Sequence, residues 1–189
     1  MSQTTTTTVP RTRPTTRTMA RWMVSFAGFP LGGYLAMLLV GPVDSTARAI
    51  AGGLVTGAVL GAAQAWGMRA DRRQTLTWTV LTAVGLSVGL AVGATVVDFG
   101  TSLGDLAVQG AISGLAVGAA QAFSLFPRIG TIAFAWPVYL AAVWTAGWVI
   151  TTSVGVQVED QFTVFGAAGA VTVTLLTAAL PVLITTRHK

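Results

Sequence analysis

Two glutamines are the most informative polar side chains in the apolar part of this chain. Gln64 and Gln121 each lie five to seven residues before an arginine, Arg69 or Arg128. At a helical rise of about 1.5 Å per residue, this places them roughly 8–10 Å inside their apolar runs. A primary amide in such surroundings needs hydrogen-bond partners. The glutamines therefore either join neighbouring helices or line the path of a polar ligand or ion, and Thr177 holds the matching position in a weaker third copy of the pattern.

Acidic residues gather at the ends of apolar runs, on the side opposite to most arginines. They are Asp44, Asp98, Asp105, Glu159 and Asp160. Carboxylates at the mouth of a path attract cations, which is one hypothesis for this acidic rim. The other is that acids simply end helices there, and Asp105 suits the N-terminus of a helix.

Residues for catalysis or metal binding are scarce. The chain has no cysteine and a single histidine, His188, and the interiors of its apolar runs hold no Lys, Arg, Asp, Glu or His. A Ser/His/Asp system, a cluster of metal ligands and a phosphate-binding loop are all missing from the sequence. We therefore expect no catalytic residue, no cofactor and no metal site, and an enzyme acting on lipids is the least favoured alternative.

The composition is that of a membrane protein. Of the 189 residues 53% are hydrophobic and 9% are charged, and the mean hydropathy is +0.71. A soluble domain carries about a quarter charged residues, so this chain has too few to cover a globular surface. The net charge of +5 is explained below by membrane topology rather than by nucleic-acid binding.

Six apolar runs are each long enough to cross about 30 Å of hydrocarbon as a helix. They lie near 20–41, 47–68, 76–97, 104–126, 132–154 and 162–184. The predicted fold is all-α, with six transmembrane helices between a disordered, cytoplasmic Thr/Arg-rich tail at 1–19 and a basic tail at 187–189. We expect Pro30 and Pro181 to kink the first and last helices, and Pro127 to follow the end of the fourth.

A row of small residues followed by the glutamine occurs twice. Gly53, Gly57, Gly61 and Gln64 recur 57 residues later, and a degraded third copy follows. The two later copies are Gly110, Gly114, Gly118 and Gln121, and then Gly166, Ala170, Thr174 and Thr177. At about 100° per residue each row occupies one helix face. Small residues at this spacing let membrane helices approach closely, so we expect these glycine ridges to pack helices together.

Tryptophans mark the start of alternate runs. Trp22, Trp78 and Trp136 open the first, third and fifth runs, at spacings of 56 and 58 residues. We expect them to be interfacial anchors, with the N–H group of each indole in the headgroup layer. They extend the repeat to three hairpins, at about 20–69, 76–128 and 132–187. Three hairpins that point the same way would be related by a pseudo-threefold axis along the membrane normal.

The basic residues predict the orientation. In a six-helix arrangement all but Arg48 fall on one side: Arg11, Arg13, Arg17, Arg21, Arg69, Arg72, Arg73, Arg128, Arg187 and Lys189. Asp71 is the one acid among them. Because basic loops stay in the cytoplasm, both termini are expected there, in a protein that crosses the inner (plasma) membrane several times.

The repeated unit resembles a loose group of uncharacterised bacterial polytopic membrane proteins with tandem GxxxGxxQ hairpins. In that group an aromatic residue and then arginine usually follow the glutamine. Here Trp66 and Phe123 stand one position later than in the group, and Arg69 and Arg128 supply the basic end. The resemblance covers most of residues 20–187 and implies an architecture, but no activity.

Three classes of function remain. The first is a non-enzymatic membrane scaffold or accessory subunit that uses its glycine-ridge faces to bind another membrane protein or a lipid. Its partners would be the bilayer and either another membrane protein or further copies of this chain, not nucleic acid. The second is a small transporter or channel with a path between the hairpins past Gln64 and Gln121. The third is the lipid-modifying enzyme.

Overall fold

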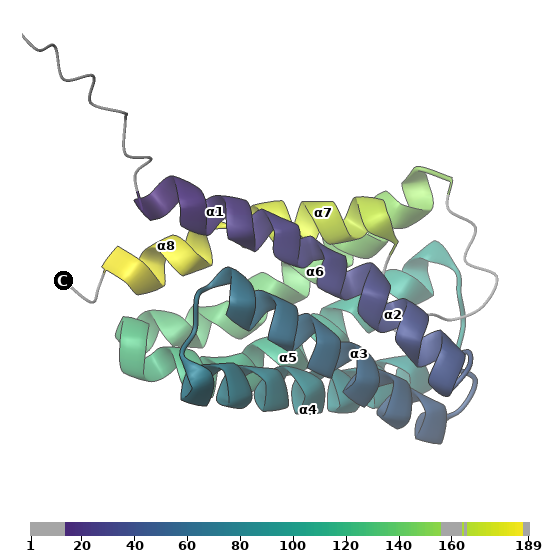
Figure 1. Ribbon diagram of the computed structural model, residues 1–189. Helices are drawn as coiled ribbons and strands as arrows, with labels where there is room; N and C mark the ends of the chain where they lie inside the picture. Colours follow the sequence, from purple (N-terminus) through teal and green to yellow (C-terminus); the bar gives the residue numbers. More distant parts are fainter. Residues whose placement is uncertain (1–13, 156–163, 165, 187–189) are drawn as a thin grey trace, which may run out of the picture.

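The computed structural model describes residues 14–155, 164 and 166–186, and the described part is helical with no strand (Figure 1). This confirms the all-α prediction. Five stretches are long and apolar enough to cross a membrane: Thr16–Leu39, Thr46–Gly67, Arg72–Val96, Leu103–Ser153 and Ala167–Ile184. The chain is therefore a helical protein compatible with membrane insertion.

The helices follow the apolar runs expected from the sequence, except that α1 begins at Pro14, inside the tail 1–19 that was expected to be disordered. In chain order they are α1 (Pro14–Val24), the 3₁₀ helix η1 (Ser25–Ala27), α2 (Gly28–Leu39), α3 (Thr46–Gly67), α4 (Arg72–Val96), α5 (Leu103–Ile129), the 3₁₀ helix η2 (Gly130–Ala135), α6 (Trp136–Ser153), α7 (Ala167–Leu176) and α8 (Ala179–Thr186). Figure 1 shows them side by side in one bundle. Because α1 contacts both α7 and α8, the first and last helices close the bundle.

Two prolines, Pro30 and Pro181, coincide with helix breaks near the residue four positions earlier in the chain. A proline lacks the N–H that would bond the carbonyl four residues earlier. For Pro30 that residue is Phe26, which lies in η1, and for Pro181 it is Thr177, which lies between α7 and α8. The kinks expected from these two prolines are thus present as helix breaks.

The prediction for Pro127 is wrong, because this proline lies inside α5 and the helix continues to Ile129. Gly130, with φ of +64°, ends the helix instead. Only glycine adopts such a conformation without strain, so the glycine rather than the proline decides where α5 stops.

The glycine ridges bring backbones into contact. A methyl group built on Gly57 would lie 2.6 Å from Ala83 Cα, and one on Gly114 would lie 2.5 Å from the Leu140 carbonyl oxygen. Each distance is too short for a real Cβ contact. The other ridge glycines of α3 and α5, namely Gly53, Gly61, Gly110 and Gly118, make contacts of the same kind. The α3 ridge therefore packs against α4, and the α5 ridge packs against an antiparallel α6.

Gly166 has a different place from the one predicted. It precedes α7 as its N-cap residue, in extended conformation, and so belongs to no helical ridge. The close contact here is made by Gly169, which meets the carbonyl of Gly147 on α6. The third copy of the ridge is thus displaced, because its helix begins later than the apolar run.

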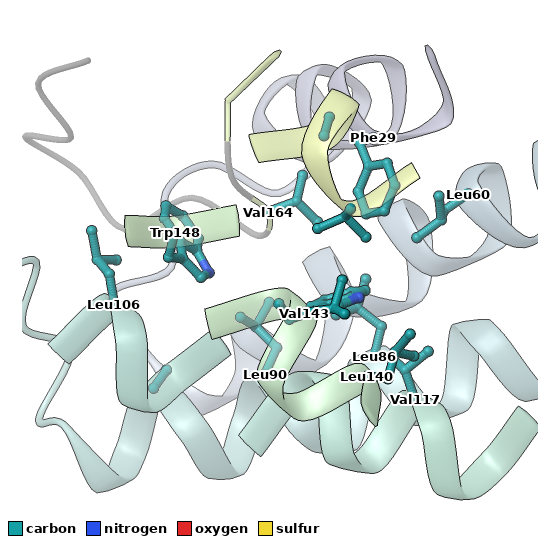
Figure 2. Packing of buried hydrophobic residues seen from close by; sticks show 14 of the residues in the cluster. Phe29, Leu60, Leu86, Leu90, Leu106, Val117, Leu140, Val143, Trp148 and Val164 are labelled. Atoms are coloured by element: carbon teal, nitrogen blue, oxygen red, sulfur yellow. The ribbon is translucent and has the colours of Figure 1, made fainter. Parts of the chain in front are cut away.

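Two clusters of buried hydrophobic side chains form the core. The larger one, shown in Figure 2, includes Phe29, Leu86 and Trp148. The smaller one includes Trp22, Trp78 and Leu125 and lies near the end of α5. The side chains of Gln64 and Gln121 lie between the two clusters.

Candidate functional site

Gln64 of α3 and Gln121 of α5 meet inside the bundle. The Gln121 Nε2 group donates to Gln64 Oε1 at 3.4 Å and to the Thr82 hydroxyl at 3.0 Å. Gln121 is only 1% exposed and its bond to Thr82 is buried, whereas Gln64 is half-buried. The sequence identified the two glutamines but missed Thr82, which lies one helical turn after Trp78 and so on the same face of α4.

The three tryptophans have partners in the protein rather than in the headgroup layer. Trp78 Nε1 donates to Gln64 Oε1 at 3.0 Å, and Trp136 Nε1 donates to Gln121 Oε1 at 2.9 Å. Trp22 Nε1 donates to the Thr174 carbonyl oxygen at 3.0 Å. Trp22 and Trp78 are at most 3% exposed, and a buried indole N–H needs an acceptor. The indoles therefore join neighbouring helices, and the anchor role expected of them stays a prediction.

The indoles also determine the orientation of the side-chain amides of Gln64 and Gln121. An indole N–H can only donate, so the atom facing it must be the amide oxygen and not the nitrogen. The network then runs from Trp136 through Gln121 to Gln64, where both Trp78 and Gln121 donate to the same oxygen. Gln64 Nε2 is left without a hydrogen bond to any residue that the structure describes.

A small cavity of about 10 Å³ lies at this centre. It is lined by Trp22, Gln64, Trp78, Val117, Gln121, Trp136, Leu140, Trp144, Val173 and Thr177. Its volume is close to the minimum of about 10–15 Å³ that holds one water molecule. The walls include members of both hydrophobic clusters, so the cavity lies where the two clusters meet.

Thr177 reaches the same cavity from the third copy of the repeat. Its hydroxyl donates to the Val173 carbonyl at 2.8 Å, within its own helix. It therefore does not take the place of a third glutamine amide. The Thr174 carbonyl oxygen accepts from the Trp22 indole instead. The acceptor is therefore a backbone group on α7, whereas it is a side-chain amide on α3 and α5.

Two apolar grooves lie on the outside of the bundle near α6. The larger, of about 390 Å³, is lined by Ala119, Ala122, Phe123, Phe126, Phe134 and Pro137, and we call it the aromatic groove. The smaller, of about 250 Å³, is lined by Ile129, Ile132, Ala135, Trp136, Tyr139, Leu176, Thr177, Ala179, Leu180 and Leu183, and we call it the α6–α8 groove. Periodicity alone does not predict either one, because both depend on how packed helices are spaced, and the α6–α8 groove in addition joins segments distant in sequence.

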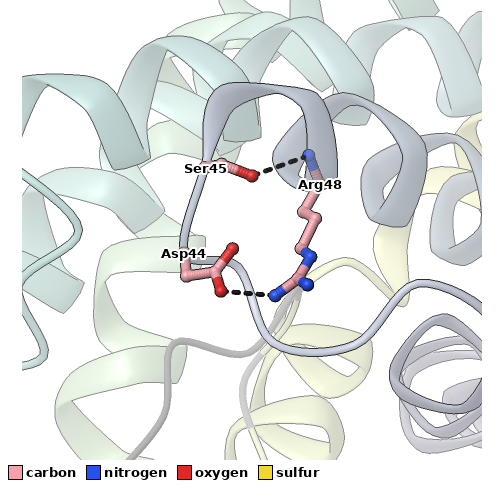
Figure 3. Close-up of polar contacts among 3 residues, drawn as sticks. All are labelled: Asp44, Ser45 and Arg48. Atoms are coloured by element: carbon pink, nitrogen blue, oxygen red, sulfur yellow. Dashed lines mark hydrogen bonds and ion pairs between the residues drawn. The ribbon is translucent and has the colours of Figure 1, made fainter.

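The described members of the acidic rim have local structural roles in two cases. Asp44 pairs with Arg48, and Ser45 caps the same turn of α3 (Figure 3). Asp105 forms a capping box with Ser102, whose backbone N–H it accepts at 3.1 Å, as a helix N-terminus favours. Asp98 is exposed, and Glu159 and Asp160 lie outside the described residues.

The described basic residues, apart from Arg48, lie at the opposite end of the bundle. Arg21 illustrates how they pack: it donates to the Trp66 carbonyl at 2.8 Å and stacks 4.2 Å above the Trp66 ring. Among the described residues there is no group of three side chains suited to hold a metal ion.

The fold and its centre thus define an all-helical protein with apolar helices and a small, neutral, hydrogen-bonded interior site. Comparison of the chain with protein-family models, curated proteins and solved structures finds no match.

Proposed function

We propose that this chain is an integral membrane protein with six crossings arranged as three repeated hairpins. The apolar stretch Leu103–Ser153 supplies two crossings, because α5 and α6 pack against each other in opposite directions. The repeat is supported by the three indole bonds, each of which runs from the first helix of a hairpin to the last helix of another. Both termini would be cytoplasmic, as the basic end of the bundle favours.

Its function, in this proposal, is that of a non-enzymatic membrane scaffold or accessory subunit that binds another membrane protein or a lipid. The observation that carries it is the neutral centre, where side chains bond one another and hold the helices together. The glycine ridges of α3 and α5 are occupied by the chain's own helices, so a partner would bind elsewhere. The aromatic groove is the best candidate for a protein partner, since Phe123 is 78% exposed and aromatic residues are enriched at interfaces.

Native mass spectrometry of the protein, extracted from its own membrane in lipid nanodiscs, tests this function. A stoichiometric membrane-protein partner should accompany the wild type and be lost from the variant Phe123→Ser. The control Val88→Ser changes another exposed apolar residue, on α4, and should retain the partner. Extraction of the chain without any protein or lipid companion would contradict the proposal.

A small transporter is the second candidate, because Gln64 and Gln121 line one cavity. A path past them requires the bundle to open, since the cavity has room for about one water molecule. Stopped-flow uptake of glycerol and urea by proteoliposomes would test it. The transport hypothesis expects flux in the wild type that Gln64→Leu and Gln121→Leu abolish, and normal flux in both variants would reject this path.

A further inference from the structure

We propose that the α6–α8 groove admits a neutral lipid that carries a carbonyl group on an apolar chain. The apolar chain of the lipid occupies the groove, and its carbonyl oxygen enters the central cavity and accepts a hydrogen bond from Gln64 Nε2. This inference rests on the proposed function, in that it names the class of lipid that the protein binds.

The first support is that the groove and the cavity have two walls in common. Trp136 and Thr177 line both of them. The aromatic groove, in contrast, shares no lining residue with the cavity. The α6–α8 groove and the cavity that holds Gln64 and Gln121 are therefore adjacent across Trp136 and Thr177.

The second support is the local weakness of the helices at this seam. The chain breaks between α7 and α8, and Leu180 N bonds the Thr177 carbonyl rather than that of Leu176. The Leu176 carbonyl is then taken up by the Tyr139 hydroxyl at 2.6 Å, from across the groove. Separation of α6 from the break between α7 and α8 should cost less free energy than separation of α3 from α4, because the contacts of α3 with α4 are continuous and glycine-packed.

The third support is the hydrogen-bonding chemistry of the centre. The amide oxygens of both glutamines already accept from indoles, whereas Gln64 Nε2 has no acceptor among the described residues. Gln64 is half-buried, so this amide nitrogen stays accessible to a ligand that supplies an acceptor. No ionisable side chain other than the phenol of Tyr139 lines either space, so a charged group would be buried there without compensation. A neutral carbonyl oxygen satisfies both conditions.

Photolabelling of the full-length protein in liposomes tests the site. The probe is a fatty acid methyl ester that carries a diazirine on its chain, and labelled residues are mapped by mass spectrometry. Saturable labelling of α6 and α8 beside the groove is expected. Labelling that grows linearly with probe concentration, as for general lipid contact, would overturn the proposal.

A matched pair of variants separates the groove from the surrounding surface. Leu175 and Leu176 are adjacent and are 56% and 46% exposed, but only Leu176 lines the groove. Leu176→Trp should lower saturable labelling about tenfold by filling the groove, and Leu175→Trp should change it less than about twofold. Equal labelling of the two variants would show that the probe binds elsewhere.

Competition identifies the chemistry of the ligand. The unlabelled methyl ester should compete about tenfold better than an alkane of equal length, because only the ester supplies an acceptor for Gln64. Equal competition would overturn the carbonyl contact, and better competition by the matching alkyl phosphate would overturn the preference for a neutral lipid. Failure here with a protein partner still present in native mass spectrometry would reject this inference and leave the proposed function standing.

Discussion

Gln121 is the residue on which the central network depends most. Its oxygen accepts from Trp136 and its nitrogen donates to Thr82 and Gln64, so that it links helices α3, α4, α5 and α6. Removal of its amide would leave the indole N–H of Trp136 without an acceptor. An unpaired buried polar group costs about 1–3 kcal/mol, which is more than the net gain from one ordinary hydrogen bond.

We therefore expect Gln121→Leu to lower the free energy of unfolding by about 1–3 kcal/mol. Thermal unfolding in detergent, followed by tryptophan fluorescence, measures the change. Thr177→Val is the control, because the Thr177 hydroxyl bonds only carbonyls of its own helix and its loss should cost less than about 0.5 kcal/mol. Equal losses in both variants would mean that the network adds nothing to stability.

The acidic rim leads to a second prediction at this scale. Asp105→Ala removes half of the capping box with Ser102 and should destabilise the protein by about 0.5–2 kcal/mol in the same assay. Asp98→Asn removes an exposed charge while keeping a residue type that tolerates the φ of +49° observed there, so little change is expected. If instead the two variants destabilise the protein equally, the acids act through their shared charge rather than through the helix end.

Single residues also show how far the sequence could predict the site. The spacing of Gln64 and Gln121 after glycine ridges placed both on packed helix faces, and the structure brings them together. The direction of the tryptophans could not be predicted in this way. A tryptophan at the start of an apolar run suits the headgroup layer and the bundle interior equally well. Only the neighbouring helix, which provides the acceptor, decides between the two.

At the scale of elements, the ridges of α3 and α5 explain why the helices stand so close. The glycines of α3 contact backbone atoms of α4, which cannot move aside without moving the whole helix. The sequence predicted this use of the ridges within the chain, since small residues at every fourth position form one face. It did not predict that the third ridge would be displaced, because the start of α7 depends on contacts that the apolar pattern does not contain.

Gly57→Ala tests the ridges directly. The added methyl group would lie 2.6 Å from Ala83 Cα, so the helices must separate, and a loss of about 1–3 kcal/mol is expected. Gly104→Ala is the matched control near the start of α5, where the nearest atom is 3.8 Å away and alanine favours the helix. Unfolding in detergent should show a lower midpoint for the first variant and an unchanged or higher one for the second. A tolerated Gly57→Ala would show that α3 and α4 are free to separate.

At the scale of the whole molecule, charge divides the bundle into two ends. Arg17, Arg21, Arg69, Arg72, Arg73 and Arg128 lie where α1 and α4 begin and α3 and α5 end. Arg48 at the other end is paired with Asp44, so its charge is compensated locally. Arg48, the one exception to the charge bias, therefore opposes that bias less in the folded protein than a count of residues suggests. This strengthens the expectation that the basic end is cytoplasmic.

Because the chain has no cysteine, single cysteines report this orientation without background. Gly104 lies at the acidic end and Thr131, in η2, lies at the basic end, and both are exposed. With a membrane-impermeant maleimide, Gly104→Cys should react in intact cells, whereas Thr131→Cys should react only after the membrane is permeabilised. The physical reason is that the six arginines at the end near Thr131 resist transfer across the membrane, while the acids near Gly104 do not. The reverse pattern would invert the protein in the bilayer, and reaction of both cysteines in intact cells would contradict a bundle whose two ends lie on opposite sides of one membrane.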